Sequence, residues 1–426
     1  MLEYFGYICA FLAIGSSLIG LTYIWALRSY TKKWSHKKPK RYPALTIISP
    51  QRGEIDQRNI DAVLGQNYLG KWELILVTTQ DDASLPQLEK YSSEHKNVKT
   101  VIADDVVQLA KTRGIHRCQK NSNLVTAIGA SSPETEVYVI VDADARPFCD
   151  WLSNLIAPIT DGNSKLGAVT SARIYLPGKG LASWVQVLWI LISDSFLVGE
   201  HRYIWGGGLA IPKSVFEKEN LMSHINGQGG CSITTDDMNI LAALRKKGYE
   251  TIFSPDCIVL RHPPETKENL LDVIRFTNRQ ILQTWWTNSY IWTYLASIGI
   301  RLPMLICALF IAWWYPFCLI ALLSVLIDVF MGIMTLKILI DTEPRISGKL
   351  LFWKINSKGN HSGRLLEPKI SVNVNFWVVL LPFVTPLVVT INSIAVPFFR
   401  KMRWSGVEYT RRTVVGYTGD FSWRAK

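Results

Sequence analysis

The sequence predicts an α/β domain with a Rossmann-like mixed sheet, joined to transmembrane helices. Two observations lead to this fold class. Between about residues 42 and 262, short β-rich runs alternate with helical stretches, an order typical of sheets with parallel strands. Outside this region the apolar residues gather in long stretches, and 48% of the 426 residues are hydrophobic. A chain of this length and patterning is too long for one simple soluble core and indicates a membrane protein.

The N-terminal stretch predicts one transmembrane helix. No charged residue occurs from Tyr4 to Leu27, which provides the ~20 apolar residues needed to cross about 30 Å of hydrocarbon. Basic residues follow at once: Arg28, Lys32, Lys33, Lys37, Lys38, Lys40 and Arg41. Such a cluster resists translocation, so the domain that follows is expected in the cytoplasm. A cleaved signal peptide is the alternative, but its basic residues would precede the apolar run.

We expect five segments along the chain. They are an N-terminal transmembrane helix (1–28), a basic linker (29–42), a cytoplasmic α/β domain (43–286), C-terminal membrane segments (287–399) and a basic cytoplasmic tail (400–426). The formal net charge of the chain is +12. Much of the excess positive charge flanks apolar stretches, so anionic lipid is a better candidate for its binding partner than nucleic acid. The seven cysteines show no paired spacing, so they indicate neither a zinc site nor a disulfide framework and fit a reducing compartment.

Four strands are predicted from short β-branched and apolar runs that end near polar residues. They are Leu45–Ser49, Trp72–Val77, Val98–Ile102 and Val137–Val141. Ligands of α/β proteins usually bind at the carboxyl ends of such strands. Polar residues at these ends are therefore candidate site residues.

Three more apolar stretches, at about 290–314, 315–340 and 375–399, predict membrane segments. Charges interrupt the first two at Arg301, Asp328 and Lys337. Four spans in total would leave the basic tail outside, against the positive-inside rule. Either the stretch with Pro382 and Pro386 is a broken or re-entrant hairpin, or one of the preceding segments lies in the interface.

The apolar stretch Leu181–Val198 is interpreted as a helix in the membrane interface. A span here would put the acidic motifs on either side of it in different compartments. An ordinary core helix is the alternative.

Two aspartates, Asp142 and Asp144, directly follow the predicted strand Val137–Val141. Because side chains alternate along a strand, residues two apart point to the same side, which suits a hard divalent cation held against a diphosphate. Aspartates are common in loops, but their position at the exit of a buried strand strengthens the signal. We expect Asp144 to hold Mg²⁺ or Mn²⁺ with support from Asp142.

A second acidic pair, Asp236-Asp237, opens a predicted helix over 238–247. Acids at the start of a helix commonly serve as caps. The alternative is that Asp237 is a general base that takes a proton from an acceptor hydroxyl.

Arg279, Gln280, Trp285 and Trp286 stand just before the C-terminal apolar block. The arginine suits a diphosphate and the tryptophans suit a sugar or acceptor face, whereas a membrane-interface belt explains both residue types equally well. The run Trp205-Gly206-Gly207-Gly208 permits a close approach of other groups to its backbone, and a plain turn is an equally good interpretation.

In order, these motifs resemble the family 2 inverting glycosyltransferases with a GT-A catalytic domain, in particular the ceramide glucosyltransferase-like branch, over nearly the whole chain. The residues that carry the resemblance are Pro50-Gln51-Arg52-Gly53 with Asn67-Tyr68, Asp81-Asp82, Lys120 with Asn123-Leu124, Asp142-Ala143-Asp144, Asp237, and the tail Arg403 to Tyr409. Two features depart from the family pattern. Asp236 replaces the usual Glu, and Gln-x-x-Arg-Trp appears only as Arg279-Gln280 followed by Trp285-Trp286.

The resemblance implies a membrane-bound, UDP-sugar-dependent hexosyltransferase with Mg or Mn as cofactor, UDP-glucose as the favoured donor, and a lipid acceptor such as ceramide or diacylglycerol. It implies that Asp237 is the base and that the donor contacts Asp82, Lys120, Asp142, Arg279 and Gln280. Trp205, Gly207, Trp285 and Trp286 would face the acceptor. A processive polysaccharide synthase is the alternative enzyme, although four or fewer spans make its polymer channel hard to build. A transporter or membrane scaffold with structural acids is the alternative outside the enzyme class.

Overall fold

The computed structural model describes residues 1–34, 38–113, 117–176, 180–199, 202–226, 235–261, 269–286, 299–342, 346–350, 353–355, 370–374, 377–404 and 407–410. The chain divides into two compact units. The sheet unit comprises Ser35–Arg173, Tyr203–Arg261 and Arg400–Lys426. The helical unit comprises Met1–Trp34, Ile174–Arg202 and His262–Phe399.

The sheet unit alternates strands and helices along most of its length. Its elements are β1 (Leu45–Pro50), α2 (Gln57–Leu64), β2 (Trp72–Thr79), α3 (Leu85–Glu94), β3 (Val98–Ala103), α4 (Val106–Arg113), α5 (Gln119–Gly129), β4 (Val137–Val141), β5 (Arg146–Pro147), α6 (Trp151–Ile156), η1 (Ile159–Asp161), β6 (Leu166–Thr170), β8 (Gly208–Pro212), α8 (Lys213–Lys218), α9 (Leu221–Ile225), α10 (Asp236–Lys246), β9 (Glu250–Phe253), β10 (Val259–Arg261), β14 (Lys401–Trp404) and β15 (Val407–Thr410). The strand β7 (Arg173–Tyr175) lies at the boundary between the two units in the sequence.

Seven strands form the central sheet in the order β3-β2-β1-β4-β8-β6-β9. The strand β1 pairs in parallel with β2 and β4, and β2 pairs in parallel with β3. The strand β8 is antiparallel to both β4 and β6, so the sheet is mixed. The predicted α/β fold with a mixed sheet is confirmed, and the four predicted strands correspond to β1 to β4.

Apolar side chains cover both faces of this sheet. On one face Ile47 and Leu74 pack with α2, α3 and α6, and on the other Ile48 and Ile75 pack with α5, α9 and α10. Strands buried on both faces are expected to be continuous apolar runs, as Val137–Val141 is. Each fully buried Leu or Ile contributes roughly 1.5–3 kcal/mol, so the two cores fix the strands firmly.

The parallel strands direct three polar segments to one edge of the sheet. Because β1, β2 and β4 run in the same direction, the residues after their carboxyl ends lie along the same edge. These residues are Gln51 after β1, Asp82 in the turn after β2, and Asp142 after β4. This is the edge at which the sequence predicts a ligand site.

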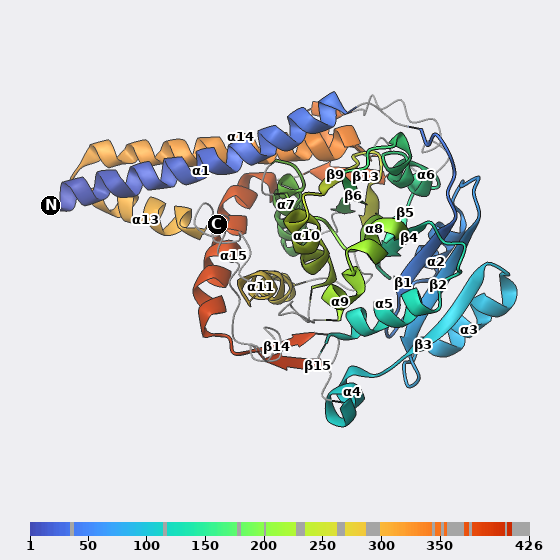
Figure 1. Cartoon of the computed structure of the whole chain (residues 1–426). Coiled ribbons are helices and arrows are strands. Elements are labelled where there is room, and N and C mark those ends of the chain that lie inside the picture. The colour runs from blue at the N-terminus through green and yellow to red at the C-terminus, as the bar shows by residue number, and fades with distance from the viewer. Residues whose placement is uncertain are drawn as a thin grey trace. The chain divides into compact units, whose positions relative to one another are not determined.

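The helical unit contains long apolar helices. Its elements are α1 (Leu2–Lys33), α7 (Leu181–Asp194), η2 (Ser195–Leu197), α11 (Leu270–Trp286), α13 (Arg301–Ile311), η5 (Pro316–Ala321), α14 (Leu322–Thr342), β11 (Ile346–Leu350), β12 (Trp353–Ile355), β13 (Ile370–Val374), α15 (Trp377–Ala395) and η7 (Val396–Phe398). The helix α1 lies alongside α13 and α14 (Figure 1). Small residues permit this close packing: Cys9, Ala10 and Ala13 of α1 contact Leu305 and Ala308 of α13.

Two helical segments, Leu2–Lys33 and Pro316–Thr335, are long and apolar enough to cross a membrane. The helix α13 has 11 residues, which span about 16 Å, or roughly half of the hydrocarbon thickness. Part of the predicted segment 290–314 lies outside the described residues. The predicted number and orientation of the membrane segments remain predictions.

The stretch predicted as an interfacial helix forms α7. Residues 182–191 of this helix are all buried, and it packs against α11 and α15 within the helical unit. Burial around the whole helix favours the alternative of an ordinary core helix.

A buried ion pair joins two of the apolar helices. Arg301 on α13 pairs with Asp328 on α14, and their side chains are 5% and 3% exposed. In the sequence these charges only interrupt apolar stretches, and the structure pairs them. The third such charge, Lys337, is exposed on α14.

Candidate active site

The turn that carries Asp142 and Asp144 is fixed at its start by backbone hydrogen bonds. It leaves β4 at Val141, and the amide of Asp142 donates to the carbonyl oxygen of Gly207 (3.2 Å). The amide of Ala145 closes the turn by donating to the carbonyl oxygen of Asp142 (3.0 Å). The side chain of Asp144 is half exposed and pairs with Arg261 (Nε to Oδ2, 3.1 Å).

Lys120 of α5 joins the two acidic motifs. Its Nζ lies 2.9 Å from Oδ1 of Asp142 and 3.4 Å from Oδ2 of Asp236, and it donates to the carbonyl oxygen of Gly206 (3.3 Å). Burial lowers the pKa of Lys120, but the Asp142 and Asp236 carboxylates outweigh it, and the net shift is upward. The lysine is therefore positively charged at neutral pH and bridges residues that are 94 positions apart in the sequence.

Asp237, the predicted base, lies in the first turn of α10 beside the same glycine. Its Oδ2 accepts from the amide of Gly206 (3.1 Å), and its Oδ1 accepts from the amide of Met238 (2.8 Å). The second bond satisfies a free N–H at the helix start, so the capping interpretation explains only one of its two oxygens. The other oxygen ties Asp237 to the glycine turn at which Lys120 and Asp142 also meet.

Burial shifts the charge balance of this acidic cluster. It raises the pKa of Asp236 to about 6, although Lys120 opposes the shift, and it raises the pKa of Asp237 as well. Burial also acts to raise the pKa of Asp142, but Lys120 outweighs it and the net shift is downward. The same lysine thus keeps Asp142 ionised, while Asp236 and Asp237 hold their protons more readily than ordinary aspartates.

The glycines at the start of β8 are required by close contacts rather than by unusual backbone angles. A Cβ on Gly206 would lie 2.6 Å from Oδ2 of Asp236, and one on Gly208 would lie 1.8 Å from Oγ of Ser171. A Cβ on Gly207 would lie 2.2 Å from the ring of Trp205 and 2.3 Å from Oδ2 of Asp142. The absence of side chains lets the acidic residues approach this backbone closely.

Gly207→Ala is expected to lower the free energy of unfolding by about 1–3 kcal/mol, because the new methyl group must displace Trp205 or the Asp142 carboxylate. Thermal unfolding of the full chain in detergent measures the effect. Gly129→Ala is the matched control, since a Cβ at that position would meet nothing within 4 Å beyond its own helix, and alanine favours the helix at the end of α5. Equal melting temperatures for both variants would contradict the close packing.

The donor set fits a divalent cation that is shared with a substrate. Asp142 and Asp144 offer hard carboxylate oxygens from one turn, and Mg²⁺ is usually bound by one or two carboxylates together with substrate phosphates. In the part of the chain that the structure describes, no group of three or more His, Cys, Asp or Glu side chains is arranged to hold a metal ion. Substrate phosphate and water are the further ligands that such a cation usually takes.

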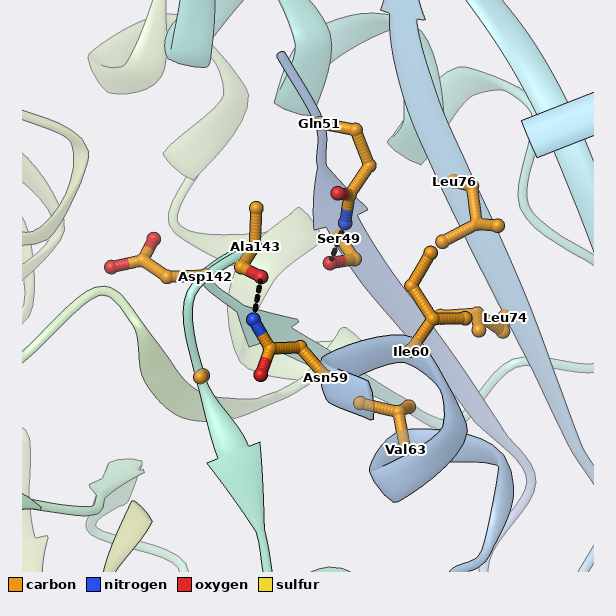
Figure 2. Close-up of a pocket in the computed structure, with 10 residues that line it drawn as sticks. Ser49, Gln51, Asn59, Ile60, Val63, Leu74, Leu76, Asp142 and Ala143 are labelled. Carbon is orange, nitrogen blue, oxygen red and sulfur yellow. Dashed lines mark hydrogen bonds between the residues drawn. The ribbon is translucent and has the colours of Figure 1, made fainter. Parts of the chain in front are cut away.

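Asp82, the predicted nucleotide contact, organises the loops after β1 and β2. Its Oδ1 accepts from the amide of Gly53 (2.8 Å), the amide of Ser84 (2.9 Å) and the hydroxyl of Ser84 (2.6 Å). Burial acts to raise its pKa, but these hydrogen bonds produce a net decrease. The neighbouring Gln51 lies in a pocket with Asp142, Ala143 and Asn59 (Figure 2). The rest of the pocket is lined by Ser49, Ile60, Val63, Leu74, Leu76 and Ala145.

Four predicted site residues belong to the helical unit. Arg279, Gln280, Trp285 and Trp286 all lie on α11, and the guanidinium of Arg279 stacks 5.6 Å from the ring centre of Phe276. The remaining predicted residues, Asp82, Lys120, Asp142, Asp144, Trp205, Gly207 and Asp237, belong to the sheet unit. Their roles in binding or catalysis remain predictions.

Several residues of this site were not predicted from the sequence. Arg261 pairs with Asp144, and Arg173 lies over the Trp205 ring (5.5 Å to its centre). Both arginines also lower the pKa of Asp142. Asn59 of α2 donates to the carbonyl oxygen of Ala143 in the Asp142–Asp144 turn, and Arg146 of β5 donates to Asn59. Only Arg146 has a local signal, because it lies two residues after Asp144 in the sequence.

Comparison with known proteins gives distant structural likenesses. No family model and no curated protein matches the chain. Among solved structures, a mannosyltransferase from Pyrobaculum calidifontis in complex with GDP-Man and Mn²⁺ is 18% identical, with a TM-score of 0.47, over 76% of this chain and 86% of that one. Glucosyl-3-phosphoglycerate synthase from Mycobacterium tuberculosis with Mn²⁺, UDP and glucosyl-3-phosphoglycerate is 14% identical, with a TM-score of 0.35, over 58% of this chain and 80% of that one.

Proposed function

We propose that this chain is a membrane-bound inverting glycosyltransferase with a GT-A type catalytic domain. It transfers a hexose, with glucose favoured, from a UDP-sugar to the hydroxyl group of a lipid such as ceramide or diacylglycerol. The transfer takes place at the cytoplasmic face of the membrane. The motifs quoted from the sequence suggest this chemistry, and the cluster around Lys120 supports it.

The observation that carries the proposal is the meeting of both acidic motifs at one glycine turn. Lys120 contacts Asp142 of the first motif and Asp236 of the second, and Asp237 is hydrogen-bonded to Gly206 of the same turn. Inverting sugar transfer needs a base and a diphosphate-binding group around one anomeric carbon. A structural role for either motif alone would not require the two to share a lysine and a turn.

In the proposed reaction Asp237 removes the proton from the acceptor hydroxyl. The acceptor oxygen then forms a bond to the anomeric carbon, while the bond from that carbon to the diphosphate oxygen breaks and its electron pair leaves with UDP. Attack from the face opposite UDP inverts the configuration at the anomeric carbon. Asp142 and Asp144 would hold Mg²⁺ or Mn²⁺, which when bound neutralises charge on the diphosphate.

The positive residues of the site suit the same leaving group. Lys120, Arg173 and Arg261 lie near Asp142 and Asp144. Their positive charges could form ion pairs with a bound diphosphate. Arg173 and Arg261 of the sheet unit are therefore our preferred candidates for binding the diphosphate, in place of Arg279, which the resemblance suggested.

The membrane part of the proposal is supported by the helical unit. Leu2–Lys33 and Pro316–Thr335 are candidate spans, and large apolar side chains on them are exposed, among them Phe5, Phe11, Trp25, Phe317 and Leu326. Exposed side chains of this kind are favourable in lipid and costly in water. Burial of each methylene group in the bilayer contributes roughly 0.8 kcal/mol of hydrophobic free energy. A lipid acceptor that reacts while its tails stay in the bilayer keeps this free energy.

The test is to incubate radiolabelled UDP-glucose with membranes from a host that expresses the chain. A labelled lipid that disappears with EDTA and returns with Mn²⁺ is the expected product. A labelled polymer would identify a polysaccharide synthase instead. No labelled product with any common UDP-hexose or lipid extract would favour the transporter or scaffold alternative, and Asp144→Asn membranes provide the inactive reference.

A further inference from the structure

A buried asparagine outside both acidic motifs holds the backbone between the two metal-motif aspartates. The Nδ2 of Asn59 donates to the carbonyl oxygen of Ala143 (3.0 Å), as the dashed line in Figure 2 shows. Asn59 lies on α2 and is 9% exposed, so this bond is largely shielded from water. It satisfies a carbonyl oxygen of the turn that carries Asp142 and Asp144.

The other end of the same amide contacts the residue that follows the turn. The Oδ1 of Asn59 accepts from Nε (3.2 Å) and Nη2 (3.1 Å) of Arg146. Nη2 of Arg146 also lies 2.9 Å from Oδ2 of Asp56, the residue that caps α2. The amide cannot be turned around, because its NH₂ would then face a guanidinium and its oxygen would face a carbonyl.

The contacts therefore bracket Asp144. Asn59 is hydrogen-bonded to Ala143, the residue before Asp144. It is also hydrogen-bonded to Arg146, which lies two positions after Asp144. The side chain of Asp144 is half exposed and pairs with Arg261. The backbone that carries this side chain is held by the hydrogen bonds of Asn59. Because half of this side chain is free of packing contacts, the anchored backbone largely determines where the carboxylate points.

We propose that Asn59, together with Arg146, is a positioning residue for a divalent cation at Asp142 and Asp144. The inference rests on the proposed function, since it assumes that this turn binds the metal. Asn59 contacts neither the metal nor the sugar donor. It fixes the spacing of the two carboxylates that do, and loss of such supporting hydrogen bonds typically weakens metal binding by about 10–100-fold.

Two variants test this role without changing the charge of the site. Asn59→Leu has a similar size and removes all three hydrogen bonds of the amide, one to Ala143 and two from Arg146. Arg146→Lys keeps the positive charge beside Asp56 but lacks the guanidinium that donates twice to Asn59. The matched control is Asn154→Leu, because Asn154 is also buried (6% exposed) and donates to a backbone carbonyl, that of Asp256.

The experiment measures binding of Mn²⁺ alone to the full chain in detergent, by the electron paramagnetic resonance signal of free and bound Mn²⁺. We expect the dissociation constant to rise about 10–100-fold for Asn59→Leu and Arg146→Lys, and to stay unchanged for Asn154→Leu. The spectrum of the Mn²⁺ that still binds should broaden, because the carboxylates are less well ordered. Near-ultraviolet circular dichroism verifies folding, and Arg146→Lys carries the test if Asn59→Leu does not fold.

Three outcomes overturn the inference. Wild-type affinity in both variants would remove the positioning role and leave the proposed function intact. Equal weakening in Asn154→Leu would show a general loss of stability instead of a specific effect. Absence of Mn²⁺ binding in the wild type, identical to Asp144→Asn both for Mn²⁺ alone and with UDP added, would refute the metal site and with it the proposed function.

Discussion

Replacing Asp237 by asparagine is expected to lower kcat for sugar transfer by about 10²- to 10⁴-fold, the usual contribution of a general base. Asparagine has almost the same shape, and its oxygen can still accept from the Gly206 amide, so the turn should stay in place. It cannot take a proton from the acceptor hydroxyl. Initial rates with radiolabelled UDP-glucose should show the loss in kcat with little change in KM for the donor.

Asp236→Asn is the matched control for this prediction. Asp236 is 4% exposed and pairs with Lys120, whereas Asp237 is more accessible, and an acceptor hydroxyl must reach the base. We therefore expect a smaller loss of kcat from Asp236→Asn. The opposite order of the two variants would transfer the role of base to Asp236.

The pH dependence of kcat gives a second readout. A base works only when it is deprotonated, so the rate should rise with pH through the pKa of Asp237. Burial raises that pKa, so the acid limb should lie above the value of about 3.9 for an exposed aspartate. An acid limb at the ordinary aspartate pKa would show that bound substrate or metal removes the shift.

The parallel half of the sheet could be predicted from sequence because its strands are continuous apolar runs. The five residues of Val137–Val141 are all buried, and β-branched residues bounded by polar ones give a strong local signal. The strand β8 gives no such signal, because Gly208–Pro212 begins with glycine and ends with proline, as a loop does. Its place between β4 and β6 depends on antiparallel pairing with residues far away in the sequence.

The site could be predicted only where its residues form local motifs. Asp142 and Asp144 follow a buried strand and Asp237 opens a helix, so each has a recognisable neighbourhood. The partners of these residues have none: Asn59 is 84 positions from Ala143, and Lys120 is 116 positions from Asp236. Such hydrogen bonds and ion pairs follow from the fold and become visible only when the strands are placed side by side.

The charges within the apolar C-terminal stretches show the same limit. Arg301, Asp328 and Lys337 look alike in the sequence, as single charges among apolar residues. The structure separates them, since Arg301 and Asp328 pair in the packed helices and Lys337 is exposed. An ion pair buried among apolar helices is costly to desolvate and is strongly disturbed when only one partner is removed.

Arg301→Ala is therefore expected to lower the free energy of unfolding by about 3–5 kcal/mol, because the Asp328 carboxylate is left buried without its counter-charge. The double variant Arg301→Leu with Asp328→Leu should recover most of the loss, since well-packed apolar residues often replace a buried pair without cost. Lys337→Ala, on the same helix as Asp328, is the control and should stay near wild type. Unfolding of the full chain in detergent, followed by tryptophan fluorescence, measures all three. A double variant as unstable as Arg301→Ala would show that the lost stability came from side-chain packing and not from the unpaired charge.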